Sequence, residues 1–349
     1  MATIPGRALH YVFKIGDRAK NAFFFRSILG MQVLRHEEFK EGCEAQCNGP
    51  YDNRWSKTMV GYGPEATHFV IELTYNYGVK NYEMGNDFGG ITIKSNEALE
   101  RARANNYPVT KENNSNVLIS PDGYRFIVLE EPQSTSTDPV VEVTLHCKNL
   151  VASKKYWHEM LAMQLLEEQS NFLLLTYGQK QAALRLREIS EPLERAKAYG
   201  RIAFAVPLAV QPTIDELVKQ ANGTILTPLI TLETPGKATV RVIILADPDG
   251  HEICFVDEEG FSELSKVEAD GDHAIINKIS PGIGKMVLSF LRLKIFFFFV
   301  IFKNKIFKKF RELCFNLGRN FIHNRSEYDV FMKLRDVLQT KITLKKCLK

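Results

Sequence analysis

The stretch "ILGMQVLRHEE" at residues 28–38 recurs as "MLAMQLLEEQS" at residues 160–170, an offset of 132 residues. Self-similarity at a fixed offset is the signature of a chain built from repeated structural units. The match therefore predicts that much of the chain consists of two similar halves.

A second pair of stretches divides each half again. "FGGITI" (88–93) resembles "YGRIAF" (199–204), and "SPDGYRFIVLEE" (120–131) resembles "DPDGHEICFVDEE" (247–259). These matches predict four modules, two in each half.

Each predicted module has the same order of elements. A strand such as "ALHYVFKI" precedes a helix whose N-cap is Asp17 in the first module and Asn149 in the third, with a stop expected at Gly30. Three strands follow, and in the second and fourth modules the alternation on either side of Pro-Asp-Gly predicts a hairpin. The sequence therefore predicts an α+β fold of four βαβββ modules.

The four modules group into two predicted domains. Residues 1–132 form the first, a Ser/Thr-rich linker flanked by Pro132 and Pro139 spans 133–138, and residues 139–265 form the second. Residues 266–349 form an atypical extension rich in basic and apolar residues. With 45% apolar and 25% charged residues, the chain has the composition of a soluble globular protein.

Positive charge is concentrated in the extension. Residues 285–349 hold 16 Lys and Arg against 4 Asp and Glu, a net charge of +12, so the rest carries −8 of the total of +4. The body therefore gives no reason to expect nucleic acid as a partner. The apolar run at 287–302 is broken by Arg292 and Lys294, so a membrane partner is not expected, with a surface role of the tail left open.

The cysteine pattern indicates a reducing compartment. Six cysteines in a chain of this length form no dense disulfide framework, and the N-terminus lacks the apolar core of a secretory signal. We expect reduced thiols and a cytoplasmic location. Cys43 and Cys47 are four residues apart, but without a second Cys/His pair we interpret them as reduced loop thiols and not as zinc ligands.

Several long stretches resemble one known superfamily. "RALHYVFKIGDRAKNAFFFRSILGMQVLRHEEF", "MVGYGPEATHFVIELTYNYGVKNYEMGNDFGGI" and the two Pro-Asp-Gly hairpins are similar to the glyoxalase I branch of the vicinal oxygen chelate (VOC) superfamily. "CNGPYD", "WSKTMVGYGPE" and "TPLITLETPGKATVRVIILADPDGHEICFV" point to a narrower group within that branch. The resemblance covers about residues 8–265 and leaves out the tail.

The resemblance implies two tandem glyoxalase-like domains whose mixed sheets curl into cups. In that superfamily one divalent metal, zinc or nickel in glyoxalase I, is held by one side chain from the first strand and one from the last strand of each of two modules. The implied chemistry is isomerisation of a glutathione hemithioacetal by a lactoylglutathione lyase, with a ligating glutamate moving the proton. Members of the group are sometimes associated with mitochondria.

An acid in an otherwise apolar strand is the first candidate site residue. Glu72 lies in "VIELTYNYG" (70–78), where an unpaired carboxylate would be costly to bury. By the resemblance, Glu72 and His10 occupy the two ligand positions of module one, and Glu72 is a candidate catalytic base. Two interpretations stay open, half of a metal site and a hydrogen-bonded His–Glu pair without metal.

The other modules depart from the ligand pattern. Module two has Gly90 and Ile127 at the corresponding positions, and neither side chain can bind a metal. Module three has Glu142 and Arg185, which are expected to form an ion pair. We interpret His251, beside the second Pro-Asp-Gly turn, as a residue of the hairpin surface.

Module four has Arg201 and Cys254, and module one is expected to close against it. A guanidinium repels a dication but favours a carboxylate or phosphate, so Arg201 is a candidate ligand-binding residue. Cys254 is a candidate ligand-binding thiol, a nucleophile or a core residue.

The incomplete ligand set decides the expected function. We expect a protein that binds or responds to a small anionic or glutathione-derived ligand, and not a working lactoylglutathione lyase. Two alternatives stay open: a divergent metal-dependent lyase or isomerase that uses His10 and Glu72, and a scaffold that acts through its outer surface.

Overall fold

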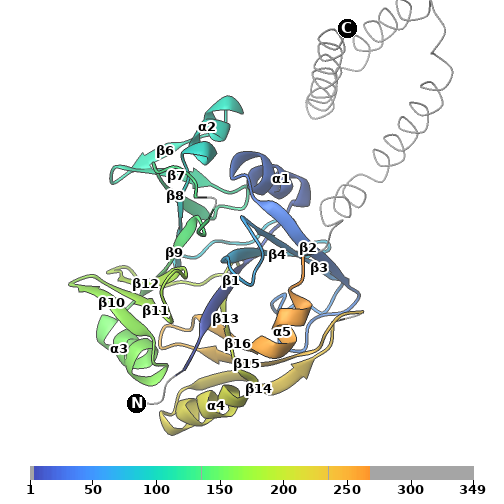
Figure 1. The fold of residues 1–349 in the computed structure, drawn as a ribbon, viewed down its shortest axis with the longest axis vertical. Helices are drawn as coiled ribbons and strands as arrows, with labels where there is room; N and C mark the ends of the chain where they lie inside the picture. Colours follow the sequence, from blue (N-terminus) through green and yellow to red (C-terminus); the bar gives the residue numbers. More distant parts are fainter. Residues whose placement is uncertain (1–3, 135, 235, 268–349) are drawn as a thin grey trace, which may run out of the picture. The chain divides into compact units, whose positions relative to one another are not determined.

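The computed structural model describes residues 4–134, 136–234 and 236–267, and in them the order βαβββ occurs four times (Figure 1). Module one contains β1 (Arg7–Lys14), α1 (Arg18–Ala22), η1 (Phe23–Ile28), β2 (Gln32–Phe39), β3 (Trp55–Gly61) and β4 (Val70–Asn76). Module two contains β5 (Phe88–Lys94), α2 (Asn96–Ala104), β6 (Thr110–Glu112), β7 (Ser115–Ile119) and β8 (Arg125–Leu129).

The second half repeats this order. Module three contains β9 (Val140–Cys147), α3 (Leu150–Lys154), η2 (Lys155–Met160), β10 (Gln164–Gln169), β11 (Phe172–Thr176) and β12 (Ala183–Glu188). Module four contains β13 (Arg201–Val206), η3 (Leu208–Val210), α4 (Gln211–Gln220), β14 (Thr224–Leu232), β15 (Val240–Ala246) and β16 (Glu252–Asp257), and α5 (Glu258–Leu264) follows it.

The modules pair across the two halves of the chain. The first sheet has the order β14-β15-β16-β13-β1-β4-β3-β2 and so joins module four to module one. The second has the order β10-β11-β12-β9-β5-β8-β7-β6 and joins module three to module two. The joining pairs, β1 with β13 and β5 with β9, are antiparallel, while the first and last strands within each module run parallel.

This pairing confirms that module one closes against module four. The predicted domain boundary near 133–138 stays a prediction, and each sheet takes strands from both sides of it.

Local signals in the sequence set the helix ends. Asp17 accepts hydrogen bonds from the amides of Ala19 and Lys20, both at 3.0 Å, and Asn149 caps α3 in the same way. Gly30 has φ of +79°, and a Cβ there would lie 2.5 Å from the Arg101 side chain. The predicted caps and the predicted stop are thus confirmed.

The two Pro-Asp-Gly turns brace neighbouring modules. Asp122 accepts a hydrogen bond at 2.8 Å from the amide of Gly16, just after β1, and Asp249 accepts one at 3.0 Å from the amide of Lys148, just after β9. Each turn therefore holds the first strand of the module that precedes its own in the chain.

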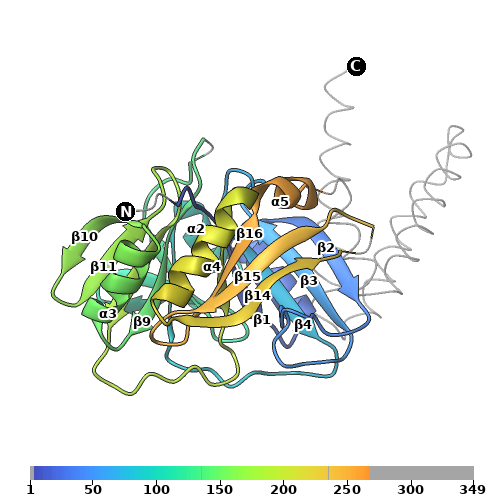
Figure 2. The same ribbon diagram turned by 90° about the horizontal axis from the view of Figure 1, so that it is seen from below.

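One large core joins the two sheets. Phe13 on β1 stacks on Tyr124 with ring centroids 3.9 Å apart, and both belong to a buried cluster that draws on all four modules. Because side chains alternate along a strand, the opposite face of each sheet is free to form a cup. The longest described helix, α4, packs against β14, β15 and β16 (Figure 2).

His251 was wrongly assigned to the hairpin surface. It is 3% exposed, and its Nε2 lies 2.7 Å from the carbonyl oxygen of His146. The cause is the bracing of its turn onto β9 through Asp249, which turns the hairpin end inward.

Among the described residues, none of the helices is long and apolar enough to cross a membrane. The expectations for the tail fall on residues 268–349, outside the described residues.

Candidate functional site

The inner face of the first sheet, called here the first cup, brings together the two residues predicted in module one. The Nε2 atom of His10 on β1 lies 3.5 Å from Oε2 of Glu72 on β4. His10 is 8% exposed and Glu72 5%, so the acid in the apolar strand is buried with a partner. Glu72 also accepts a hydrogen bond at 3.2 Å from the hydroxyl of Thr74.

A third acidic residue, Glu65, holds the other side of the imidazole. Its Oε1 lies 2.6 Å from Nδ1 of His10, and its Oε2 accepts a hydrogen bond at 2.5 Å from Nη1 of Arg35. Glu65 is fully buried, which by itself would raise its pKa, but Arg35 and His10 hold the pKa at about 2. The imidazole is therefore fixed between two carboxylates.

The ionic network continues along β2 and β3. Glu37 accepts from Nε of Arg35 at 3.2 Å and lies 2.9 Å from Nζ of Lys57 and 3.1 Å from Nζ of Lys237. Burial would raise the pKa of Glu37, but these cations, led by Lys57, lower it to about 2. Arg35 and Glu37 share a face because they are two residues apart on a strand.

Arg201 lies in the same cup, on β13. Its Nε and Nη2 donate to Oε2 of Glu252 at 2.9 and 2.7 Å, and Glu252 is its register partner on β16. Its Nη1 donates to the carbonyl oxygen of Ala45 at 3.0 Å, and Nη2 also donates to that of Gln46 at 3.2 Å. The guanidinium of Arg201, which we predict to bind an anion, is thus covered by two backbone carbonyl groups.

Cys254 occupies the strand position equivalent to Glu72. In module one Glu72 stands two residues beyond Val70, the register partner of His10, and in module four Cys254 stands two residues beyond Glu252. Burial raises the pKa of its thiol to about 12. The thiol form predominates at neutral pH, which argues against a thiolate nucleophile.

Lys14 is a further cation of this cup. It is 3% exposed, and its Nζ donates to the carbonyl oxygens of Tyr199 at 2.8 Å and Lys197 at 3.3 Å. Desolvation lowers its pKa to about 7 although the charge of Glu252 raises it, and the charges of Arg195 and Arg201 act in the same direction as desolvation. The amine is therefore close to its midpoint of protonation at neutral pH.

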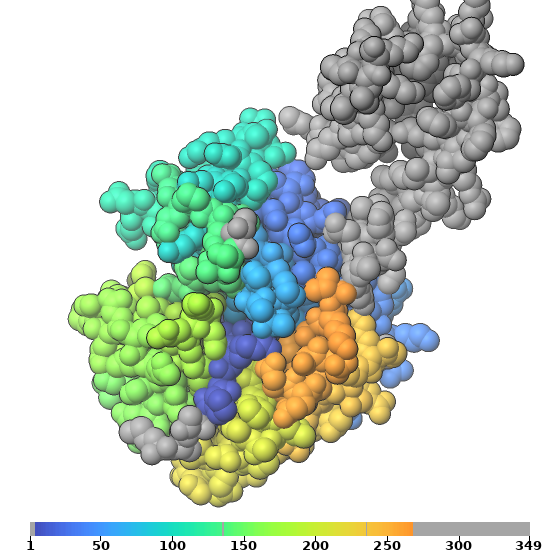
Figure 3. Space-filling model, viewed as in Figure 1, coloured from blue at the N-terminus to red at the C-terminus, as the bar shows by residue number. Residues whose placement is uncertain are grey.

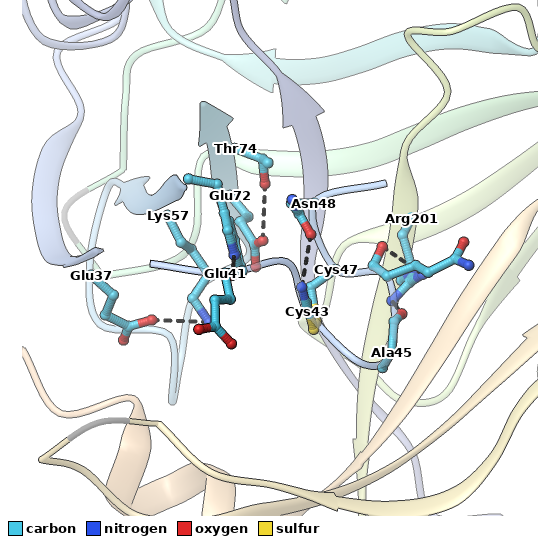
Figure 4. Close-up of a disulfide and its surroundings, with 12 residues drawn as sticks. Glu37, Glu41, Cys43, Ala45, Cys47, Asn48, Lys57, Glu72, Thr74 and Arg201 are labelled. Atoms are coloured by element: carbon cyan, nitrogen blue, oxygen red, sulfur yellow. Dashed lines mark hydrogen bonds and ion pairs between the residues drawn. A yellow bond between two sulfur atoms is a disulfide. The ribbon is translucent and has the colours of Figure 1, made fainter. Parts of the chain in front are cut away.

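The capping loop, residues 40–54 between β2 and β3, covers Arg201 (Figure 4). Within it Cys43 and Cys47 form a disulfide, so the expectation of two reduced thiols was wrong. The residues form a turn, closed by a hydrogen bond from the amide of Gln46 to the carbonyl of Cys43, which brings the two Cα atoms to 5.4 Å. That separation is within the range of disulfides.

The inner face of the second sheet, called the second cup, carries no ligand set. Glu142 and Arg185 form the predicted ion pair, with two hydrogen bonds of 2.7 and 2.8 Å. Gly90 and Ile127 offer no donor atoms. The connection between β10 and β11 is two residues long, too short to cover the cup, and Figure 3 shows a hollow between modules two and three.

The residues of the first cup do not fit a complete divalent-metal site. His10 and Glu72 fit two ligand positions, but Arg201 places a positive charge at a third position and Cys254 a protonated thiol at the fourth. The described residues hold no group of three or more His, Cys, Asp or Glu side chains arranged for a metal ion.

Sequence reasoning missed Glu65 and Glu252. Glu252 had a usable signal, because it is two residues before Cys254 and must share its face of the strand. Glu65 lies in a loop, and no periodicity predicts where a loop side chain points.

Comparisons with known proteins agree with this fold. Residues 7–126 match the family model described as Glyoxalase/Bleomycin resistance protein/Dioxygenase superfamily, and residues 149–264 match the C-terminal domain model of glyoxalase domain-containing protein 4-like proteins. The maize glyoxalase I crystal structure superposes with a TM-score of 0.63 at 24% identity, covering 74% of this chain and 95% of that one. This likeness supports the α+β VOC fold.

Proteins of similar sequence show to which family within this superfamily the chain belongs. Rat glyoxalase domain-containing protein 4 is 51% identical over 77% of this chain and 91% of its own length. A Caenorhabditis elegans protein named Glyoxalase 1 is 46% identical over 79% of this chain and 97% of its own. The chain belongs to the glyoxalase domain-containing protein 4 family.

Proposed function

We propose that the chain binds a small anionic ligand in the first cup and does not act as a lactoylglutathione lyase. The observation that carries the proposal is Arg201, a buried guanidinium at a position where the superfamily pattern has a metal ligand. Apart from its ion pair with Glu252, the guanidinium donates only to two uncharged acceptors. These are the carbonyl oxygen of Ala45, which accepts from Nη1, and that of Gln46, which accepts from Nη2. A carboxylate or phosphate would replace these contacts with hydrogen bonds in which both the donor and the acceptor are charged.

The charge balance around Arg201 supports an anion. Arg195 lies 3.3 Å from the same carboxylate, that of Glu252. The Nζ of Lys14 contacts two backbone carbonyls and the ring of Tyr199, which are all uncharged. Three basic side chains thus surround Glu252. A second negative charge in this corner would be stabilised by all three, and glutathione-derived molecules, which carry carboxylates, belong to the ligand class that fits.

One observation favours a second candidate, a divergent metal-dependent lyase or isomerase. His10 is held at Nδ1 by Glu65 and faces Glu72 with Nε2, and a carboxylate behind a histidine is how metal ligands are commonly oriented. The two side chains could hold a zinc or nickel ion weakly, with Glu72 as the base. We place this candidate second because Arg201 opposes a dication.

Calorimetric titration of the full chain with phosphate, small dicarboxylates and glutathione conjugates, once with the Cys43–Cys47 disulfide intact and once with it reduced, tests the first proposal. We expect binding that Arg201→Ala weakens at least about tenfold, since a charge-assisted pair contributes about 1.5–3 kcal/mol. Arg185→Ala in the second cup is the matched control and should bind as the unchanged chain does. Affinity should fall as pH rises above 7, because Lys14 then loses its proton.

Two results would overturn the proposal. One is the absence of binding across the panel in both redox states, and the other is equal binding by Arg201→Ala and the unchanged chain. Elemental analysis distinguishes the metal-dependent enzyme from the anion-binding protein. The enzyme requires about one equivalent of bound metal, which is lost in His10→Ala.

A further inference from the structure

The middle of the capping loop is built into the first cup. Ala45 is fully buried and belongs to the apolar cluster that includes Leu9, Ala203 and Phe261, while its neighbours Glu44 and Gln46 are exposed. The carbonyl oxygens of Ala45 and Gln46 are the ones that cap Arg201 (Figure 4). The loop therefore occupies the space that an anion at Arg201 would need.

The disulfide fixes the shape of this capping turn, residues 43–47. It closes a ring over five residues, within which Gln46 has φ of +50°, a left-handed conformation that glutamine seldom adopts. The ring holds two successive carbonyls toward the same guanidinium. Without the covalent bond, three kinds of contact would remain to hold the turn in place. They are the apolar contact of Ala45, the two hydrogen bonds from Arg201 and the hydrogen bonds of the local backbone, which no longer have a covalent closure behind them.

The base of the loop is anchored independently of the disulfide. Asn48 is fully buried and donates to the carbonyl oxygen of Tyr51 at 2.8 Å and to Oδ1 of Asn76 at 2.9 Å. Asn76 in turn donates at 3.0 Å to the carbonyl oxygen of Asn48. The turn can therefore move about a fixed base while the sheet beneath it stays folded.

We propose that the Cys43–Cys47 pair is a redox site that latches the capping turn over Arg201. A dithiol reductant attacks the disulfide and supplies two electrons and two protons, so that the S–S bond breaks, both cysteines become thiols and the reductant becomes a disulfide. Both cysteines are half-exposed, which makes them accessible to such a partner. The latch rests on the proposed function, because Arg201 is the group that it uncovers.

Hydrogen exchange of the full chain tests the latch without any ligand. We compare the oxidised protein with the protein reduced by dithiothreitol and follow the amides of residues 42–54. Maleimide labelling of Cys254, located by peptide mapping, is measured after the dithiothreitol has been removed under anaerobic conditions. We expect the rate of amide exchange and the rate of maleimide labelling each to rise about 10- to 30-fold on reduction. This is the factor that the loss of chain entropy on closing a ring of about five residues predicts. Exchange in β9 of the second sheet should not change.

Matched variants isolate the disulfide. Cys43→Ser should exchange rapidly with or without dithiothreitol, whereas Cys147→Ala, which removes a buried free thiol, should respond as the unchanged chain does. Two results would overturn the latch: residues 42–54 that exchange equally in both redox states, or two free thiols at Cys43 and Cys47 after treatment with oxidised glutathione.

The outcome separates the latch from the anion site. A loop that opens on reduction in a protein that binds none of the anions supports the latch and contradicts the proposed function. Anion binding that depends on Arg201 and is equal in both redox states, with equal loop exchange, supports the function and contradicts the latch.

Discussion

Glu65 shows at the scale of one residue how a buried charge can determine stability. It balances Arg35, which is 1% exposed, and it orients His10. Removing one partner of a buried ion pair leaves the other charge uncompensated in a low-dielectric environment, and that cost exceeds the attraction between exposed pairs. The acid therefore stabilises the cup although it lies outside any strand.

We expect Glu65→Gln to lower the free energy of unfolding by about 3–5 kcal/mol, measured by urea denaturation. Glu131→Gln is the control, because its pair with Lys94 is half-exposed on both sides and should contribute less than about 1 kcal/mol. Similar losses in the two variants would contradict the assignment of Glu65 as the buried counter-ion.

The two buried acids of the ionic network, Glu37 and Glu65, predict how the stability of the fold depends on pH. Glu37 and Glu65 have pKa values of about 2 in the folded protein against an ordinary 4.5, so their stabilisation is present above pH 4.5 and is lost as pH falls toward 2. In Glu65→Gln this acid-induced loss should be smaller, since one of the two groups no longer titrates.

At the scale of the element, the Pro-Asp-Gly turns act as braces as well as hairpin ends. Asp122 accepts from Gly16 and from the side chain of Asn21, and Asp249 accepts from Lys148. We expect Asp122→Ala to lower the stability of the chain by about 1–3 kcal/mol, because the half-buried amide of Gly16 and the buried side chain of Asn21 lose their acceptor. Thermal unfolding measures this, and Asp52→Ala, in the capping loop, serves as a comparison that should change little.

Most elements could be predicted from the sequence because they depend on local signals. The N-caps Asp17 and Asn149, the stop at Gly30 and both hairpins follow from residue type and spacing alone. The closure of module one against module four came from the resemblance to tandem glyoxalases, because no local signal encodes which distant strand β1 pairs with.

The candidate site was only partly predictable. His10, Glu72, Arg201 and Cys254 follow from the resemblance and from the alignment of the four modules, so their shared cup was accessible from the sequence. The ion pair of Arg201 with Glu252 had a signal in the strand spacing that was not used. The burial of Glu65 and the Cys43–Cys47 bond depend on loop conformation and tertiary packing, which spacing does not determine.

At the scale of the whole molecule, neither half of the chain contains a complete sheet. In the first sheet, residues 1–132 supply only β1, β2, β3 and β4, and residues 139–267 supply the other four strands. We expect each half alone to lack a cooperative thermal transition in circular dichroism, and the two halves co-expressed to assemble. A half that unfolds cooperatively as a monomer would show that the predicted boundary at 133–138 separates independent domains.

The position of β1 also has a consequence for biosynthesis. This strand leaves the ribosome before the other fifteen described strands, yet it pairs on one edge with β13, which emerges only after modules one to three. Until then one row of its backbone amides and carbonyls has no native partner, and such an edge invites pairing with other chains. The nascent protein therefore depends on protection of its earliest strand throughout translation, and slow elongation between modules three and four should increase co-translational aggregation.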